Sequence, residues 1–228
     1  MIFSYAPSLR SDFPELATAV LLVHGISGAT DTGSSALRLT ELAAQRIAVG
    51  TESDLPEIVA WRRAFSRMGL KPTQYRCASE ALLRRLRKEG SLPSGHPFVT
   101  LCNATSAAYA IPIAAFDATR LAGNLMVRPA LGTETYQTFS GAVEYPDPGE
   151  VIFADTESRA HARRWTNRQS GYSAVSNTTH SVVLVAEAMH RTGKADLKGL
   201  VDSLTTSIKT LWPDALVEQV TPQSSESQ

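Results

Sequence analysis

Cysteine is scarce in this chain of 228 residues, and so are the features that depend on it. Only Cys77 and Cys102 are present, which is too few for a disulfide framework or a four-cysteine zinc site. No apolar run approaches the roughly 18–20 residues that a membrane span requires. The N-terminus, MIFSYAPSLRSDFPE, lacks the basic and apolar regions of a secretory signal. We therefore expect a protein of the reducing cytoplasm with no membrane partner.

Motifs for hydrolysis, nucleotide binding and metal binding are also missing. LLVHGISG has the His-Gly pair of a hydrolase oxyanion segment, but no G-x-S-x-G nucleophile elbow follows, and His24 reads as a hydrogen-bonded histidine at a strand end. GISGATDTG has neither the Gly-Lys-Ser/Thr ending of a P-loop nor G-x-G-x-x-G spacing. The five histidines are scattered without an H-x-x-x-H pair. We expect no metal and no cofactor.

The net charge is zero, but the charges are unevenly distributed along the sequence. Residues 61–90 contain nine lysines and arginines against two acids, and residues 159–168 contain four against none. Residues 1–60 and 91–158 each contain seven acids. Two basic blocks in a neutral chain indicate an anionic partner on one face. The alternative is that they form the solvated faces of helices and strands.

Hydrophobic periodicity predicts an α+β fold. Helices are expected over residues 36–50, 54–69, 79–90, 98–111 and 195–212. Strands are expected over residues 19–26, 124–130, 135–139, 150–155, 162–166 and 180–188. These strands are too short and too regularly spaced for βαβ units, so we expect a largely antiparallel sheet flanked by helices. One domain is predicted over residues 1–212, followed by a polar, flexible tail over 213–228.

The stretch from Pro93 to Thr179 carries several short motifs in a distinctive order. It contains NATSAAYAIPIAAFD, then GNLMVRPA, then PDPGEVIFAD, then RRWTNRQSGYSAVSNTT. This series resembles the B3/B4 domain, the editing module of the bacterial phenylalanyl-tRNA synthetase β subunit, which also occurs as a free-standing protein. The upstream segment WRRAFSRMGLKPTQYRCASEALLRRLRKEGSLP resembles the helical N-terminal lead-in of the free-standing form. The resemblance covers about residues 55–190.

The resemblance implies a trans-acting editing deacylase that hydrolyses misacylated aminoacyl-tRNA, with tRNA and not DNA as the partner. Such a reaction needs a positioned water and a donor for the developing oxyanion, and neither requires a catalytic triad. The sequence therefore identifies no catalytic residue. Two alternatives stay open: a non-catalytic module that binds tRNA or other RNA, and a protein that binds an amino acid or small molecule.

The resemblance also implies a substrate pocket. Asn103 matches the helix residue that faces the family's pocket, and Asp117 ends the P-x-x-x-F-D run. Ala114 stands where the synthetase has a histidine, which places the specificity for tyrosine in question. The acid that contacts the tyrosine hydroxyl would be Glu134 or Glu144. The far wall would carry Thr178 and Thr179.

The arginine-rich stretch ARRWTNRQS, residues 162–170, is expected to be a strand with Arg163 and Trp165 on one face and Arg164 on the other. Arg164 or Arg168 would line the pocket and hold a carbonyl or phosphate. The alternative is a structural network in which these arginines pair with Glu150 or Asp155. The phosphates of tRNA are expected to contact eight of the nine cations of the first basic block, namely Arg62, Arg63, Arg67, Lys71, Arg84, Arg85, Arg87 and Lys88.

Overall fold

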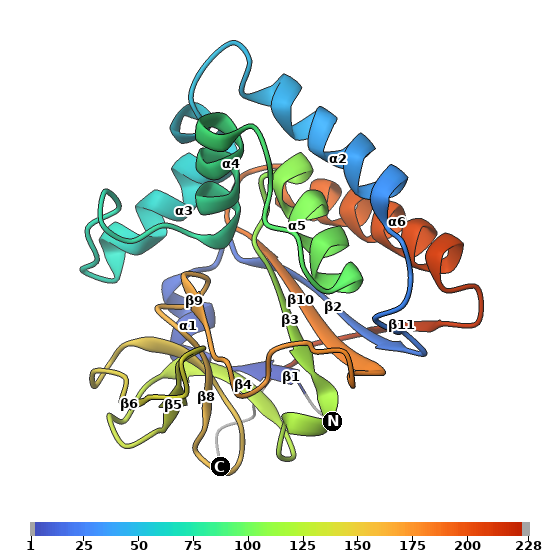
Figure 1. The fold of residues 1–228 in the computed structure, drawn as a ribbon. Coiled ribbons are helices and arrows are strands. Elements are labelled where there is room, and N and C mark those ends of the chain that lie inside the picture. The colour runs from blue at the N-terminus through green and yellow to red at the C-terminus, as the bar shows by residue number, and fades with distance from the viewer. Residues whose placement is uncertain (1–2, 225–228) are drawn as a thin grey trace.

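Two β-sheets and a group of helices make up the fold (Figure 1), which the computed structural model describes for residues 3–224. The helices are α1 (Pro7–Asp12), α2 (Gly33–Arg46), α3 (Pro56–Arg67), α4 (Ala78–Glu89), α5 (Pro97–Tyr109) and α6 (Gly193–Leu211), with 3₁₀ turns η1 (Glu52–Asp54) and η2 (Ala118–Arg120). The strands are β1 (Phe3–Tyr5), β2 (Ala17–His24), β3 (Ile113–Asp117), β4 (Leu125–Pro129), β5 (Tyr136–Gln137), β6 (Val143–Glu144), β7 (Val151–Ala154), β8 (Ala160–Arg163), β9 (Arg168–Gln169), β10 (Ser181–Ala188), β11 (Leu216–Val220) and β12 (Gln223–Ser224).

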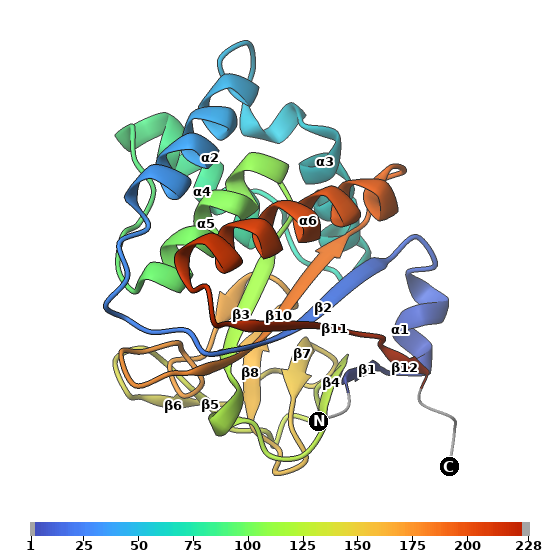
Figure 2. The same cartoon turned by 90° about the vertical axis from the view of Figure 1, so that its right-hand side faces the viewer.

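The four-stranded sheet has the order β11-β2-β10-β3, and each neighbouring pair is antiparallel. Its central strands are buried on both faces, which explains their nearly continuous apolar sequences. Alternate residues of β10 point to opposite faces. Val182 and Leu184 pack with residues of α5 and α6, whereas Val183 and Val185 pack toward the six-stranded sheet. Figure 2 shows α5 and α6 on one side of this sheet and the other strands below it.

The six-stranded sheet has the order β12-β1-β4-β7-β8-β9. Strand β1 pairs in parallel with β4 and β12, and the remaining pairs are antiparallel. Strands β5 and β6 form a separate antiparallel hairpin. The prediction of an α+β fold with largely antiparallel sheets is therefore confirmed.

The predicted helices are present, and local sequence explains their ends. Helix α3 begins at Pro56, a residue suited to a first helical position because it has no amide hydrogen to donate. Helix α4 ends before Gly90, which adopts a left-handed φ of 72°. Helices α3 and α4 form the lead-in segment, which is a minor part of the fold. They contribute Trp61 and Leu83 to the core between the two sheets.

The chain beyond residue 212 differs from the predicted flexible tail. Strand β11 pairs with β2 over five residues, and β12 pairs with β1. Strand β11 lies at the edge of its sheet, and Leu216, Glu218 and Gln219 are exposed. Residues 225–228 lie outside the described part of the chain.

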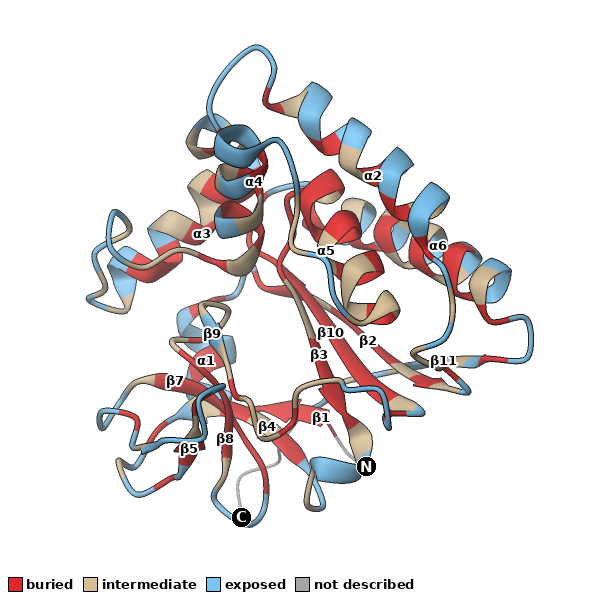
Figure 3. Ribbon diagram, viewed as in Figure 1, coloured by how far each residue is buried: buried red, intermediate tan, exposed pale blue. Residues whose placement is uncertain are grey.

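Buried residues concentrate in β2, β7, β8 and β10 and on the inner faces of the helices, while the outer face of α2 is exposed (Figure 3). Two aromatic side chains, Trp61 and Trp165, are essentially inaccessible at the centre of the core. Among residues 3–224, no helix combines the length and the apolar character that crossing a membrane would demand.

Candidate functional site

A cavity of about 50 Å³ lies between the two sheets, close to the start of α4. The four-stranded sheet supplies β3 and β10 to its wall, and the six-stranded sheet supplies β7, β8 and β9. The lining residues are Ala78, Pro112, Ile113, Ala114, Phe153, Ala162, Trp165, Thr166, Asn167, Arg168, Gln169 and Glu187. The wall is largely apolar but includes one buried acid and several polar groups, a combination found in ligand pockets.

Glu187 is the buried acid of this cavity, with 1% of its surface exposed. Its Oε1 accepts hydrogen bonds from the Tyr5 hydroxyl at 2.5 Å and the Trp165 indole at 2.9 Å. The Trp61 indole donates to its backbone carbonyl at 3.3 Å. Residues two positions apart in a strand share a face, so Glu187 lies on the same face of β10 as Val183 and Val185 and points toward the six-stranded sheet.

Burial raises the pKa of Glu187 to about 7 from an ordinary value of 4.5, and the hydrogen bonds from Tyr5 and Trp165 only partly oppose this effect. The acid has no ion-pair partner among residues 3–224. Burial and the neighbouring Glu187 charge also raise the pKa of the Tyr5 hydroxyl. A carboxyl with a pKa near 7 exchanges a proton at physiological pH, as groups at catalytic sites often do.

The stretch 163–168 forms a tight turn rather than the continuous strand expected from its sequence. Strand β8 ends at Arg163, and Arg164 and Trp165 then adopt left-handed φ values of 48° and 58°. The turn places the Trp165 ring in the core, edge-on to Trp61 and Phe13 at centroid distances of 5.3 and 5.0 Å. The predicted alternation of Arg163 with Trp165 is therefore wrong, because the backbone reverses between them.

The arginines of this stretch have different roles. Arg163 is buried and donates to both carboxylate oxygens of Glu150, at 2.9 and 2.8 Å. This bond confirms the expected structural network for Arg163. Arg164 lies over the Tyr75 ring, 4.8 Å from its centroid, and does not line the cavity. Arg168 does line the cavity and forms an exposed pair with Glu144 at 2.9 Å.

Asp155, the other acid expected near these arginines, pairs elsewhere. It contacts His161 at 3.1 Å and Arg159 at 3.5 Å. Burial opposes its ionisation, but hydrogen bonds from His161 and from nearby backbone amides lower its pKa to about 2. Asp155 therefore holds the β7–β8 turn as a carboxylate.

Polar groups of the turn and of β9 complete the cavity wall. The Thr166 hydroxyl is buried and has no hydrogen-bond partner within the described residues. Asn167 donates to the Arg76 carbonyl at 2.7 Å, and Gln169 donates to the Ala115 carbonyl at 2.6 Å. These two amides fix the turn, whereas the Thr166 hydroxyl remains able to bind a ligand.

The cavity contains few of the pocket residues expected from the resemblance. Arg168 lines it, Glu144 lies behind Arg168, and Ala114 contributes a methyl group to the wall. Asn103 lies on α5, from which no residue lines the cavity, and it is half-buried. Glu134 is fully buried in the loop after β4.

Glu134 holds the backbone of its own loop. It accepts hydrogen bonds from the amides of Leu131 and Gly132 at 3.0 Å and pairs with Arg128. Burial opposes ionisation, but the Leu131 amide and the Arg128 guanidinium lower the pKa of Glu134 to about 2. These bonds occupy both oxygens, so Glu134 has a structural role and leaves no atom for a substrate hydroxyl.

Asp117 and Thr179 lie together away from the cavity. The buried Thr179 hydroxyl donates to Asp117 at 2.6 Å, and Thr119 donates to the other carboxylate oxygen from its amide and its hydroxyl. Burial disfavours the ionised Asp117, but these bonds outweigh it and hold its pKa below the ordinary value. Thr178 is exposed beside Ser176. This cluster joins β3 to the start of β10.

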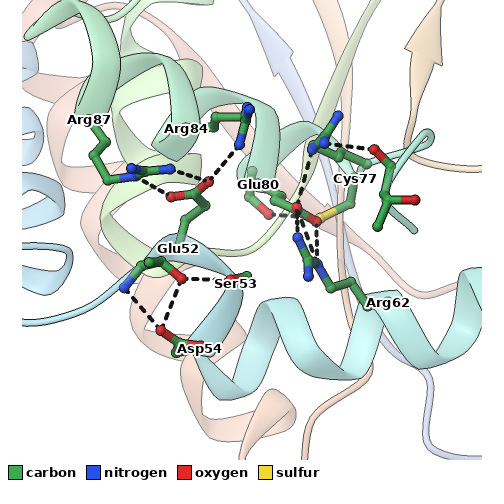
Figure 4. A network of polar contacts seen from close by, with 12 residues as sticks. Glu52, Ser53, Asp54, Arg62, Cys77, Glu80, Arg84 and Arg87 are labelled. Atoms are coloured by element: carbon green, nitrogen blue, oxygen red, sulfur yellow. Dashed lines mark hydrogen bonds and ion pairs between the residues drawn. The ribbon is translucent and has the colours of Figure 1, made fainter.

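Most cations of the first basic block are paired with acids of the same chain. Figure 4 shows the pairs of Arg62, Arg84 and Arg87. Arg62 contacts the fully buried Glu80 at 2.6 Å. Arg84 and Arg87 share Glu52, at 3.6 and 2.7 Å. The acid Glu52 comes from the N-terminal segment of excess negative charge, so the fold neutralises much of the unevenness seen in the sequence.

The rest of the block divides into paired and unpaired cations. Arg67 pairs with Glu15, and Arg85 pairs with Glu89 at 2.8 Å. Within residues 3–224, the cations of this set that form no ion pair are Arg63, Lys71 and Lys88, all of them exposed. The surface available for phosphate contacts is therefore smaller than the sequence count suggested.

Sequence reasoning missed Glu187, Tyr5 and Thr166. The signal for Glu187 was present, because SVVLVAEA contains one acid in an otherwise apolar strand. A lone acid in a buried strand must be paired, protonated or functional. Tyr5 and Thr166 gave no such signal, since their contacts come from distant parts of the chain.

Comparisons with known proteins agree with this architecture. Residues 60–199 match the model of the family described as the B3/4 domain. A solved N-terminal fragment of the phenylalanyl-tRNA synthetase β subunit from Pyrococcus horikoshii has a similar fold, with a TM-score of 0.55 and 9% sequence identity. The similarity covers 98% of this chain and 52% of that fragment, so this chain spans about half its length. A search of curated proteins gave no match. Because the family model matches more than half of the sequence, the chain belongs to the B3/4 domain family.

Proposed function

We propose that this protein is a trans-acting editing deacylase, which binds the aminoacyl ester of a misacylated tRNA beside Glu187 and hydrolyses it. The observation that supports this proposal is a carboxyl group with a pKa of about 7 in the wall of a largely apolar cavity. At pH 7 about half of such groups are ionised, which suits a general base that must also return its proton.

In the proposed reaction, the Glu187 carboxylate takes a proton from a water as the water oxygen bonds to the ester carbonyl carbon. The bond from that carbon to the ribose oxygen then breaks, and the protonated Glu187 returns the proton to the ribose oxygen. The unpartnered Thr166 hydroxyl donates a hydrogen bond to the substrate, and Arg168 at the cavity rim contacts the ribose or its phosphate. Glu187 is thus proposed for a catalytic role to which the sequence analysis assigned no residue.

The size of the cavity favours a small aminoacyl side chain. A cavity of roughly 150 Å³ is known to hold benzene, and this one measures about 50 Å³. A methyl or hydroxymethyl group fits beside Ala114 without movement of the 164–169 turn, whereas a phenol ring does not. We therefore expect tRNA carrying alanine or serine to be a better substrate than tRNA carrying tyrosine.

The direct test is deacylation of a panel of misacylated tRNAs at stated salt. We expect Glu187→Gln to slow hydrolysis by at least 100-fold, the usual contribution of a general base. The control is Glu218→Gln, an exposed acid on the same sheet, which should behave as the parent. Ala114→Leu should block the cavity and abolish hydrolysis while the fold remains intact. Hydrolysis that is unaffected by Glu187→Gln would contradict the role of Glu187.

A second candidate function is the binding of a free amino acid or other small molecule in the same cavity. The pairing of most cations in the first basic block favours it, because that block was the reason to expect a polyanionic partner. Calorimetric titration with free amino acids separates the two functions. Saturable binding of an amino acid without deacylation of any tRNA would support the second candidate and exclude the deacylase.

A further inference from the structure

Three side chains that could bind a metal ion meet at the end of β10, outside the cavity at Glu187. Glu57 lies in the first turn of α3, and Asp196 lies in the first turn of α6. His190 lies in the loop between β10 and α6. One ligating atom from each residue comes within 4.8 Å of the other two. The fold thus assembles a His–carboxylate cluster that the spacing of histidines in the sequence did not indicate.

Two atoms of this cluster are buried without a partner. Within the described residues, Glu57 Oε2 and His190 Nδ1 form no hydrogen bond, although each residue is only 9% exposed. The remaining atoms are engaged. Arg46 donates to Glu57 Oε1 at 2.7 Å, and Asp196 Oδ2 lies 2.7 Å from His190 Nε2 and accepts from Thr192 at 2.6 Å.

The hydrogen bonds determine what kind of group could satisfy these two atoms. A carboxylate oxygen facing His190 Nε2 requires this nitrogen to donate, so the neutral ring has its lone pair on Nδ1. Glu57 Oε2 is also a lone-pair donor to a cation. Two unpartnered acceptors buried in the same cluster call for a positive ion or a bridging donor. A histidine that binds a metal through one nitrogen commonly donates from the other to a carboxylate.

We propose that Glu57 Oε2 and His190 Nδ1 bind a first-row divalent metal ion, for which Zn²⁺ is the best match, while Asp196 orients the imidazole through Nε2. An imidazole nitrogen with carboxylate oxygens is a donor set used by Zn²⁺, whereas Mg²⁺ and Ca²⁺ prefer oxygen alone. Ligand atoms in zinc sites lie about 2.0–2.2 Å from the ion. Glu57 and His190 therefore supply two ligands, and water completes the coordination.

The metal joins elements that support the cavity wall without touching its lining. It links the start of α3 to the start of α6, and both flank the end of β10, which carries Glu187. Helix α3 also carries Trp61, whose indole contacts the Glu187 carbonyl. An ion that binds the folded chain only will raise its stability by an amount that grows with the logarithm of the free ion concentration above the Kd. The role of this site is structural and independent of the proposed deacylation.

The test uses the full chain after chelator treatment, titrated with Zn²⁺ alone in calorimetry and thermal melting. We expect one equivalent per chain and a higher melting temperature that is reversed by chelator. Glu57→Gln and His190→Gln should each weaken binding at least tenfold, although the glutamine at position 57 can still accept from Arg46. His24→Gln is the matched control, because His24 bonds to Ser181 on the same sheet, and it should bind as the parent.

Substitution of Co²⁺ for Zn²⁺ supplies a measurement that needs no variant. A bound Co²⁺ ion of low coordination number with nitrogen and oxygen ligands gives visible absorption stronger than that of the hydrated ion. If the parent shows no saturable binding, or only the spectrum of hydrated Co²⁺, the proposal is wrong. Binding by Glu57→Gln and His190→Gln that equals the parent would also overturn it.

Discussion

Glu187→Gln should change the dependence of stability on pH. The pKa of Glu187 is raised from 4.5 to about 7 in the folded chain, chiefly by burial. The folded state therefore holds its proton more tightly than the unfolded state. Between these two pKa values the unfolded chain is ionised while the folded chain is protonated, so stability falls as pH rises. Below pH 4.5 and above pH 7, Glu187 no longer makes the free energy of unfolding depend on pH.

The magnitude follows from the size of the shift. One pKa unit corresponds to 1.36 kcal/mol, so ionised Glu187 costs the folded chain about 3 kcal/mol relative to its protonated form. The amide in Glu187→Gln keeps an acceptor for Tyr5 and Trp165 and does not ionise. The stability of the variant relative to the parent should therefore increase by about 2.5 kcal/mol from pH 5 to pH 8, since part of the effect already occurs below pH 5. For a chain of this size that corresponds to about 5–10 °C in melting temperature.

The assay is thermal or denaturant unfolding of both proteins at several pH values between 5 and 8. The difference between them isolates Glu187, because distant groups contribute equally to both. Arg10 is the charged neighbour that stabilises the carboxylate, and Tyr5 does not titrate in this range since its pKa is raised. A stability difference that stays constant from pH 5 to pH 8 would refute the assignment of a raised pKa.

Two further predictions concern the basic side chains. Arg163→Ala leaves the buried Glu150 carboxylate unpaired and should lower the unfolding free energy by about 3–5 kcal/mol. Arg168→Ala breaks an exposed pair with Glu144, so it should cost about 1 kcal/mol or less, but it should lower deacylation at least tenfold. Equal melting temperatures for the two variants would contradict this distinction. Among the described residues, the unpaired cations of the first basic block are Arg63, Lys71 and Lys88. If tRNA binds through these alone, the logarithm of its affinity should fall against the logarithm of salt concentration with a slope of about −2 to −3. A slope near about −8 would mean that the paired cations also bind.

The helices and most strands could be predicted because their signals are local. Apolar spacings of three and four, Pro56 at a helix start and Gly90 past a helix end are all properties of neighbouring residues. The turn at Arg164 and Trp165 could not be predicted in this way. Neither residue favours a left-handed conformation, and the turn forms because the core accepts the Trp165 ring and Glu187 accepts its indole hydrogen.

The candidate site was predicted less well, because it depends on which distant residues meet. The sequence indicated that Arg168 and Ala114 belong to a pocket, and both line the cavity. It did not indicate that Arg62 would pair with Glu80, or that Glu52 would neutralise cations some thirty residues later. Counts of charge along a sequence overstate a basic surface when acids from another segment fold onto it.

Glu187 stands out because it reduces stability at the pH where the protein is expected to work. The strand β10 is otherwise apolar, and glutamine or a larger apolar side chain would fill the same position without an ionisable group. A residue that conflicts with its local environment and has no compensating ion pair indicates a site whose chemistry needs that residue. The cavity beside it and the unpartnered Thr166 hydroxyl supply room and a hydrogen-bonding group for a ligand. Deacylation by the parent and by Glu187→Gln is therefore the comparison that most directly tests function.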